Sequence, residues 1–419
     1  MTNNIAVIIL AAGKGERMKS SVPKVLHSIC ARPMISYVLD LVKGLKINTV
    51  VAVVGYGQEQ LLPFLGPEIK VATQENLLGT ADAVKQALKA LKNFKGTVLV
   101  LYGDNPLLKK ETIAKLLKHH ADNRSAATLL TAVVDKPKGY GRILRDKYSS
   151  ICGIAEEKDA DDFQKEIKEV NTGIICFDKE PLVQALKEVK PDNRKKEYYL
   201  TDAVGIIYKK GFRIESVKIN DANEALGINS RIELAKANAI MRMRINENLM
   251  EAGVTIVDPD STFISYSAKI GRDTTIYPFT VIASGVKIGK RCLVGPFVHL
   301  REGTYLQDDA VLGNFLEIVR SRISSKALIK HFGYLGDAKV GRAVNVGAGC
   351  VTANFDGKNK NVTVIKDRAF IGSDTVLVAP VKIGRAAKTG AGSVVVKNQN
   401  VPDGAVVVGV PARSLKIKR

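Results

Sequence analysis

The 419-residue sequence contains no tryptophan and only five cysteines, and aromatic residues make up 6% of the chain. The cysteines are scattered and form no C-x-x-C pair, which argues against a disulfide framework or a cysteine-based metal site. The apolar run Ile5 to Ala12 is too short to span a membrane, and it lacks the flanking segments of a secretory signal. These absences predict a cytoplasmic protein with reduced thiols and no membrane span.

Acidic residues are also comparatively few. The chain has 63 Lys and Arg against 42 Asp and Glu, which gives a formal net charge of +21. Such an excess suits anionic ligands and permits nonspecific contact with nucleic acid. The basic residues are spread along the chain and form no tract with interleaved aromatics, so no specific nucleic-acid partner is expected. A lysine-rich solvated surface is the simpler explanation of most of the excess.

The chain is longer than one hydrophobic core usually organises, so two or more domains are expected. From the start to Asn229, β-rich runs alternate with segments of helical periodicity. Strands are predicted over residues 5–10, 49–54 and 97–101, and helices over residues 33–46, 79–92 and 110–120. This alternation predicts a Rossmann-like α/β domain with a mostly parallel sheet over residues 1–229. Ligands of such sheets bind beyond the carboxyl ends of the strands.

A different architecture follows a connecting helix, which is predicted over residues 230–252 and is amphipathic. In the remainder, residues 253–419, aliphatic residues recur at intervals of six and are often followed by glycine. The first series is Ile264, Ile270, Ile276, Ile282, Ile288, Val294, Leu300, Leu306, Leu312 and Ile318, and the second is Val340, Val346, Ile365, Ile371, Leu377 and Ile383. A solenoid whose three flat faces each take one hexapeptide has this period, with aliphatic residues inside and glycines at the corners.

The six-residue pattern resembles that of the hexapeptide-repeat acyltransferases, whose left-handed parallel β-helices usually assemble as trimers with active sites between neighbours. The resemblance implies a left-handed β-helix and a homotrimer. The phase of the repeat is lost between Ile318 and Val340 and again between Thr352 and Ile365. Loops or irregular coils are expected at these two interruptions, and functional residues are expected there.

A glycine-rich turn follows the first predicted strand, with the sequence L-A-A-G-K-G-E-R-M from Leu10 to Met18, and then Pro23-Lys24. Its small residues would let backbone N–H groups approach a triphosphate, while Arg17 and Lys24 would stabilise charge on the transferred phosphoryl group. The turn is neither a Walker A loop nor a full dinucleotide fingerprint, because Met18 stands where glycine is required. Taken alone, such a turn is equally compatible with a purely structural role.

The complete string L-A-A-G-x-G-x-R-M-x4-P-K resembles the signature of sugar nucleotidyltransferases. That resemblance implies catalytic roles for Arg17 and Lys24 and a Mg²⁺ site at Asp104 and Asn229. It also implies nucleotide- and sugar-binding roles for Leu10, Ala11, Ala12, Gly13, Lys24, Gln74, Gly79, Thr80, Tyr102, Gly103, Asp104, Gly141, Glu156, Asn171 and Asn229. Carboxylate and amide oxygens suit Mg²⁺, which keeps several waters and bridges substrate phosphates. A capping or turn role is the alternative for Asp104.

The reaction that the resemblance implies is attack by an oxygen of a sugar 1-phosphate on the α-phosphorus of a nucleoside triphosphate, with release of pyrophosphate. Since this nucleophile is already anionic, positioning and charge stabilisation would carry catalysis without a general base.

Together the two halves resemble the bifunctional bacterial enzymes that are both N-acetylglucosamine-1-phosphate uridyltransferase and glucosamine-1-phosphate acetyltransferase, with UTP and acetyl-CoA as co-substrates. His331, in the string H-F-G-Y-L-G-D, matches the histidine that deprotonates the sugar amine, a role that suits an imidazole. The resemblance assigns amino-sugar-phosphate binding to Arg301, Tyr334, Asn345 and Lys360, and acetyl-CoA binding to Asn354, Phe355, Ser373 and Ala391.

Some positions depart from that family. Val319 stands where a lysine usually contacts the sugar phosphate, a role that Arg320 would have to take. Losing one charge-assisted contact costs about 1.5–3 kcal/mol, which weakens a site without abolishing it. The other departures are Leu77 for a glutamine, Phe355 for a tyrosine, and Gly409 for an arginine that holds coenzyme A, with Arg413 nearby.

Three functions remain open from the sequence. The first is the bifunctional synthesis of UDP-N-acetylglucosamine. The second, favoured by Val319 and Gly409, is a nucleotidyltransferase for another sugar 1-phosphate whose β-helix is an assembly scaffold or acylates a different amine. The third is a scaffold with a regulatory nucleotide-binding domain, and it is opposed by the presence together of Arg17, Lys24, Asp104 and Asn229. Among the other histidines, His119 and His120 close a predicted helix and are expected to be structural, whereas His27 and His299 have no evident partner.

Overall fold

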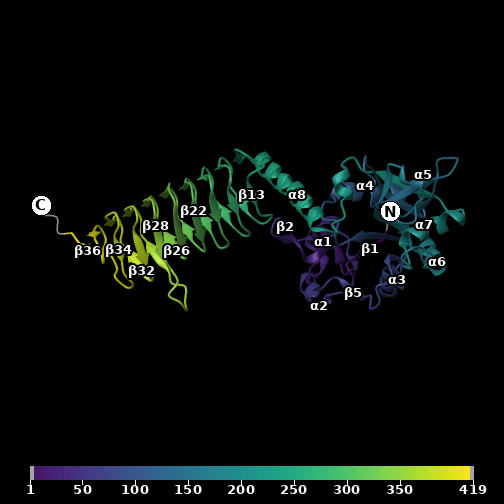
Figure 1. The fold of residues 1–419 in the computed structure, drawn as a ribbon, viewed down its shortest axis with the longest axis horizontal. Coiled ribbons are helices and arrows are strands. Elements are labelled where there is room, and N and C mark those ends of the chain that lie inside the picture. Colours follow the sequence, from purple (N-terminus) through teal and green to yellow (C-terminus); the bar gives the residue numbers. More distant parts are fainter. Residues whose placement is uncertain (1–3, 416–419) are drawn as a thin grey trace. The chain divides into compact units, whose positions relative to one another are not determined.

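The computed structural model describes residues 4–415. The chain forms two compact units, an N-terminal unit that ends at Asn238 and a C-terminal unit that begins at Ala239. The division falls within the long helix α8 (Arg231–Glu251), which occupies the predicted connecting segment (Figure 1). None of the described helices is both long and apolar enough to cross a membrane.

The N-terminal unit is built on a sheet with the strand order β11-β7-β10-β6-β1-β4-β5, extended by the hairpin β8-β9. Strand β10 runs antiparallel to both of its neighbours, whereas β4, β1 and β6 run parallel to one another. The mostly parallel sheet is therefore confirmed. The strands are β1 (Ile5–Leu10), β4 (Thr49–Val54), β5 (Lys70–Thr73), β6 (Thr97–Tyr102), β7 (Ala127–Val133), β8 (Gly141–Arg145), β9 (Ile151–Ala155), β10 (Glu169–Asp178) and β11 (Ile214–Lys218).

Helices cover both faces of this sheet. Alternate residues of β1 enter two separate cores, with Ile8 in one and Ile9 in the other, which explains why the strand is apolar throughout. Helices α3, α6 and α7 line the first core, and α1 and α4 line the second. The helices are α1 (Met34–Gly44), α2 (Gln58–Leu61), α3 (Thr80–Ala90), α4 (Lys110–Asn123), α5 (Asp162–Lys165), α6 (Lys179–Glu188) and α7 (Leu200–Lys209); the short elements are η1 (Glu16–Met18), η2 (Lys24–Leu26), η3 (Leu62–Phe64), η4 (Ala222–Ala225), β2 (Ser28–Ile29) and β3 (Arg32–Pro33).

The C-terminal unit is a left-handed parallel β-helix whose strands stack into three faces. Face 1 contains β12 (Thr255–Ile256), β15 (Thr275–Ile276), β18 (Leu293–Val294), β21 (Val311–Leu312), β24 (Leu328–Ile329), β27 (Asn345–Val346), β30 (Phe370–Ile371), β33 (Lys388–Thr389), β35 (Val406–Val408) and β36 (Arg413–Ser414). Face 2 contains β13 (Phe263–Ile264), β16 (Val281–Ile282), β19 (Val298–Leu300), β22 (Leu316–Val319), β25 (Gly333–Gly336), β28 (Cys350–Ala353), β31 (Val376–Val378) and β34 (Val394–Val395). Face 3 contains β14 (Lys269–Ile270), β17 (Lys287–Ile288), β20 (Tyr305–Leu306), β23 (Arg322–Ile323), β26 (Ala338–Val340), β29 (Thr363–Ile365) and β32 (Val381–Ile383).

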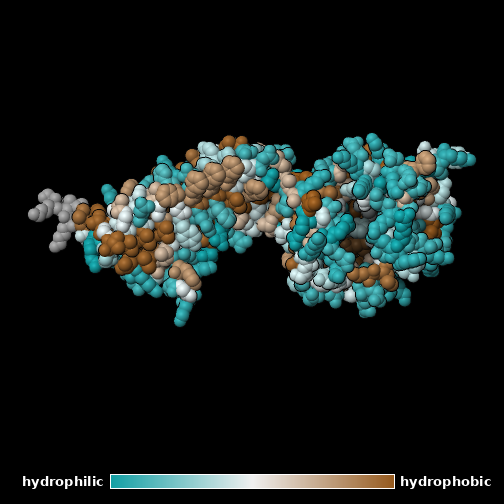
Figure 2. All heavy atoms as spheres, in the orientation of Figure 1, coloured by the Kyte–Doolittle hydropathy of each residue, from teal (hydrophilic) through white to brown (hydrophobic). Residues whose placement is uncertain are grey.

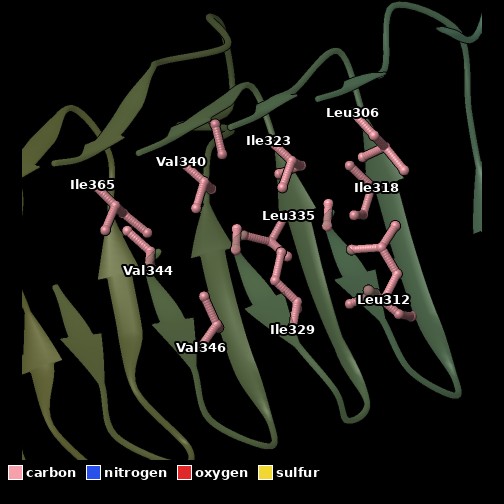
Figure 3. Packing of buried hydrophobic residues seen from close by; sticks show 14 of the residues in the cluster. Leu306, Leu312, Ile318, Ile323, Ile329, Leu335, Val340, Val344, Val346 and Ile365 are labelled. Carbon is pink, nitrogen blue, oxygen red and sulfur yellow. The ribbon is translucent and has the colours of Figure 1, made fainter. Parts of the chain in front are cut away.

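The aliphatic residues of the six-residue pattern fill the interior of the β-helix. Figure 3 shows Leu306, Leu312 and Ile318 pointing inward from successive strands. Each of them is at most 1% exposed, so each buries its whole side chain, which contributes about 1.5–3 kcal/mol relative to leaving it in water. Ile245, Leu249 and Met250 of α8 pack against the same core.

The predicted loss of regular coiling between Ile318 and Val340 is wrong. Strands β23, β24 and β25 continue the stack, and their inward residues are Ile323, Ile329 and Leu335. Two steps of five residues, each at the corner between faces 2 and 3, shift the phase without breaking the coil. The second interruption is confirmed, because residues 354–362 form an inserted loop between β28 and β29.

Candidate active sites

The glycine-rich turn after β1 is shaped around Lys24. Gly15 adopts a φ of 67°, and a Cβ at this position would lie 2.7 Å from the Cβ of Lys24, so only glycine fits without strain. A Cβ at Gly13, in contrast, would meet no atom within 4 Å. The backbone at Gly13 therefore borders open space, as a close approach by a phosphate group requires.

Lys24, Asp104 and Asn229 converge at the end of the central strands. The Lys24 ammonium donates to Oδ2 of Asp104 and to Oδ1 of Asn229, the latter at 2.8 Å. Backbone hydrogen bonds assemble the cluster, since the N–H of Gly103 donates to Leu10 and the N–H of Ile228 donates to Asp104. Asp104 is 8% exposed, so its charge is shielded from solvent. The predicted metal ligands thus lie together, with a cation between them.

A cavity of about 270 Å³ opens beside this cluster. Its lining comprises Leu10, Ala11, Ala12, Gly13, Lys24, Val25, Gln74, Leu77, Gly79, Thr80, Ala83, Tyr102, Asp104 and Glu197. Most of the nucleotide-binding residues predicted from the sequence are among them. Gln74 is held rigidly, because its amide donates to the Gly79 carbonyl at 3.0 Å and to Asp82 at 2.8 Å.

The predicted sugar-binding residues adjoin Tyr102. Gly173 has a φ of 86°, and a Cβ there would lie 2.9 Å from the Tyr102 ring, so this glycine lets the ring pack on the backbone. Asn171 pairs in register with Gly141 of the neighbouring strand β8. A Cβ at Gly141 would in turn lie 3.5 Å from the Glu156 carboxylate. These four positions therefore form one continuous surface.

Carboxylates near this surface have altered acidities. Burial raises the pKa of Glu156, and this effect outweighs the lowering by the hydrogen bond that Thr201 donates at 2.8 Å. Burial and the charges of Glu156 and Asp159 raise the pKa of Asp202 to about 6. Burial and the charges of Glu156 and Asp104 raise the pKa of Tyr102, which keeps its hydroxyl protonated. The surface thus offers the Tyr102 hydroxyl as a donor beside carboxylate acceptors.

Arg17 lies apart from the other predicted residues. It is exposed on η1 and forms no hydrogen bond or ion pair with any residue from 4 to 415. The segment around Tyr198, which the sequence did not predict to belong to the site, pairs through its backbone with Leu78 and Ala81. Glu197 lines the cavity from this segment. No periodic pattern marks the segment, and its polar and aromatic residues were the only local signal.

In the β-helix, His331 belongs to a row of equivalent positions. Each member lies two residues after the inward residue of a face 1 strand, at the corner that leads to face 2. The row contains His331, Ala348, Ser373, Ala391 and Gly409. The predicted catalytic histidine thus stands in line with two predicted acetyl-CoA residues. Its side chain is exposed and makes no hydrogen bond to another described residue.

Two of the residues predicted to bind the sugar phosphate, Arg301 and Lys360, lie at the opposite edge of face 2. Arg301 follows β19 at the corner with face 3, and it pairs with Glu317 at 2.7 Å. Lys360 lies in the inserted loop, where its backbone forms an isolated antiparallel β-bridge with Phe355. Tyr334 projects from face 2 itself, whereas Asn345 belongs to face 1. In one chain these residues therefore occupy two faces and the corner between faces 2 and 3.

The structure shows what surrounds the residues of the β-helix that depart from the family pattern. Val319 is 3% exposed, and the adjacent Arg320 forms a two-pronged ion pair with Asp337 at 2.7 and 2.8 Å. This hydrogen-bonded pair lowers the pKa of Asp337. Arg320 is therefore already engaged and would have to leave Asp337 to replace the missing lysine. Arg413 pairs in register with Val408, which places it across a hairpin from Gly409.

Other histidines have partners within the N-terminal unit. His120 is 2% exposed and contacts the Thr128 hydroxyl at 2.9 Å and Asp178 at 3.3 Å. His27 contacts Arg231 at 3.2 Å, and burial together with the Arg231 charge lowers its pKa. These contacts account for both His120 and His27 as structural side chains.

Comparison with known proteins covers both units. Residues 7–170 match the MobA-like NTP transferase domain, and residues 267–302 match the bacterial transferase hexapeptide family of six repeats. The chain is 42% identical to the bifunctional protein GlmU of Halalkalibacterium halodurans, across 97% of this chain and 96% of that protein. It is 45% identical to GlmU of Pelotomaculum thermopropionicum over 90% of each chain. It is 43% identical to GlmU of Heliobacterium modesticaldum over 96% of this chain and 94% of that protein.

Proposed function

The chain belongs to the GlmU family of bifunctional transferases, and from this premise we propose which residues carry each of its reactions. It is a nucleotidyltransferase and an acetyltransferase that synthesises UDP-N-acetylglucosamine. Acetyl transfer from acetyl-CoA to glucosamine 1-phosphate precedes uridylyl transfer from UTP to N-acetylglucosamine 1-phosphate.

For uridylyl transfer, we assign the site to the cavity beside Lys24. A phosphate oxygen of N-acetylglucosamine 1-phosphate attacks the α-phosphorus of UTP, the new P–O bond forms, and pyrophosphate leaves. Lys24 stabilises the charge that develops on the phosphoryl oxygens, and the backbone around Gly13 receives the phosphates. Arg17 is free to join them when UTP is bound. The single observation that carries this assignment is the convergence of Lys24, Asp104 and Asn229.

We propose that Asp104 and Asn229 hold Mg²⁺. Their side-chain oxygens already face one positive group, the Lys24 ammonium, so they converge on a point where a cation is favourable. Two protein oxygens are typical for Mg²⁺, which takes its other ligands from water and substrate phosphates. When bound, Mg²⁺ supplies charge neutralisation for the triphosphate. The Asn229 backbone N–H donates to Glu233 at 2.7 Å, which fixes the orientation of this segment.

For acetyl transfer, we assign His331 as the base. It removes a proton from the amine of glucosamine 1-phosphate; the amine nitrogen bonds to the acetyl carbon as the C–S bond of acetyl-CoA breaks, and the leaving thiolate takes up the proton from His331. Ser373 and Ala391, in the same row of corner positions, would contact coenzyme A. Arg301 and Lys360 would bind the sugar phosphate, although in one chain they lie across face 2 from His331.

That separation is the main support for a homotrimer, in which a second copy of the chain would complete each acetyltransferase site. The outward side chains of faces 1 and 2 supply apolar contact area. Figure 2 shows apolar patches over the β-helix, and the exposed residues include Leu293, Phe297, Phe315, Phe370 and Val281. Phe279, Phe297 and Phe315 stack along the corner between these two faces, with ring centroids 4.8 and 4.9 Å apart. We also assign both reactions to the cytoplasm, since all five cysteines are free thiols.

A second candidate follows from Val319 and Arg320. With the lysine absent and Arg320 paired to Asp337, the β-helix would bind glucosamine 1-phosphate weakly and serve mainly in assembly. An assay that offers UTP, acetyl-CoA and glucosamine 1-phosphate together, with products resolved by mass, separates the candidates. A UDP-linked acetylated amino sugar supports the bifunctional assignment. Uridylyl transfer to added N-acetylglucosamine 1-phosphate without acetyl transfer would support the second candidate instead.

A further inference from the structure

Face 3 of the β-helix carries an outward row of basic side chains. One residue from each strand, in direct register with the next, contributes to it. The row, which we call the face 3 row, is Lys269, Lys287, Tyr305, Arg322, Lys339, Val364 and Lys382. Five of its seven members are cations, and none is an acid. Neighbouring strands lie about 4.8 Å apart, so the row is straight and about 29 Å long.

This arrangement works against the stability of the sheet. Like charges directly opposite one another destabilise strand pairing, and both Lys269–Lys287 and Arg322–Lys339 are such pairs. Within residues 4–415, none of the five cations of the row forms an ion pair. A solvated surface would be served better by alternating signs, as at the corner where Arg291 pairs with Asp309. The uncompensated row points to an external anion.

A groove of about 350 Å³ lies at the C-terminal half of the row. Its charged lining residues are Arg322, Lys339, Lys366, Asp367 and Arg385. Two carboxylates nearby are already engaged: Asp367 accepts the backbone N–H of Arg342 at 2.8 Å, and Asp403 pairs with Lys366 at 3.2 Å. The groove therefore keeps a cationic excess, and an anion following the row would enter it.

Face 3 differs from the other two faces in this respect. The outward residues of face 1 include Leu293, Val311 and Phe370, and those of face 2 include Val281 and Val376. Apolar outward positions suit contacts between copies of the chain. Face 3, with its charged row, suits contact with solvent and with soluble polyanions.

We propose that the face 3 row binds a single-stranded nucleic acid through its phosphates, without regard to sequence. A straight row one residue wide matches a linear polyanion better than the two-dimensional surface of a membrane. The row also interleaves an aromatic residue among its cations, since Tyr305 lies between Lys287 and Arg322. The Arg322 guanidinium already stacks on the Tyr305 ring at 4.9 Å, and cations with aromatics along one groove are the usual design of strand-binding proteins.

Fluorescence anisotropy with a labelled oligo-uridine RNA of roughly 20 nucleotides tests this proposal on the full-length protein. The variant Lys287→Gln/Arg322→Gln/Lys339→Gln removes three cations of the row. The matched control, Lys43→Gln/Lys115→Gln/Lys236→Gln, removes three exposed lysines of the N-terminal unit. Each phosphate contact contributes about 0.7 to the salt slope, so the row variant should lose about 100-fold in affinity at 0.1 M salt and about 2 units of slope.

Both variants should retain uridylyl and acetyl transfer, because none of the substituted residues belongs to either site. Equal losses of affinity in the row variant and the control would overturn the proposal, since they would mean that net charge alone attracts RNA. Failure of the wild-type protein to bind the RNA at low salt would overturn it too. If the protein bound phosphatidylserine vesicles more tightly than RNA, and this binding depended on the face 3 row, the partner would be a membrane and the proposed nucleic-acid partner would be rejected.

Discussion

Replacing Asp104 by asparagine tests the uridylyltransferase site most directly. Asn has nearly the same shape as Asp, so the substitution removes the negative charge and little else. Asp104 accepts from the Lys24 ammonium and is 8% exposed, so solvent does not screen the interaction. A hydrogen bond between charged groups contributes about 1.5–3 kcal/mol. Each 1.36 kcal/mol is a factor of ten in rate, which predicts a fall in kcat/KM for uridylyl transfer of about 10- to 150-fold.

The assay is pyrophosphate release from UTP and N-acetylglucosamine 1-phosphate across a Mg²⁺ titration, and the variant should need more Mg²⁺ for half-maximal rate. Acetyl transfer in the same preparation serves as an internal control and should be unchanged. Asp122→Asn is the matched control variant, because Asp122 pairs with Lys118 on an exposed helical surface outside the cavity. A wild-type rate and Mg²⁺ requirement in Asp104→Asn would refute the assignment of the site.

Four further changes have distinct expected outcomes. His331→Ala should lower acetyl transfer by about 10²- to 10⁴-fold, measured as release of the free coenzyme A thiol, and should leave uridylyl transfer intact. Gly79→Ala should destabilise the N-terminal unit by about 1–3 kcal/mol in denaturant unfolding, because φ is 115° and the new Cβ would lie 2.5 Å from the Tyr198 carbonyl oxygen. Gly13→Ala should keep wild-type stability, since nothing lies within 4 Å, yet should raise the KM for UTP. Burial and two neighbouring carboxylates raise the pKa of Asp202 to about 6, so folding favours its protonated form; the stability this gives at low pH is lost between about pH 4 and pH 6. Melting temperatures of Asp202→Asn and wild type should therefore agree near pH 4 and diverge above pH 6 in favour of the variant; parallel curves would contradict this.

Much of the fold could be predicted from local patterns. The strands beginning at Ile5, Thr49 and Thr97 were correctly predicted, because apolar runs bounded by polar residues are properties of short segments. The six-residue period predicted the β-helix for the same reason. The prediction was wrong between Ile318 and Val340, where steps of five residues keep the coil intact. The corner between faces 2 and 3 can be one residue shorter without breaking the coil, and a strict six-residue period does not match such a shortened step.

The candidate sites were only partly predictable. The glycine-rich turn and Asp104 belong to contiguous strings, and the structure brings them to one cavity. The Tyr198 segment carries no such string, and its place at the cavity depends on hydrogen bonds to Leu78 and Ala81. Likewise, the engagement of Arg320 by Asp337 depends on coil stacking, which sets residues 17 apart side by side.

Periodicity and short motifs were enough to predict the two architectures and the chemical character of the nucleotide loop, because both are local properties of the chain. Only the tertiary structure brought Asn229 to Lys24 across 205 positions, since that contact depends on the order of strands in the sheet. It also gathered the face 3 row. Along the chain those cations are far apart, but the stacking of successive coils aligns them in one row, with Tyr305 between Lys287 and Arg322. Charge spread evenly along the sequence thus becomes concentrated in space.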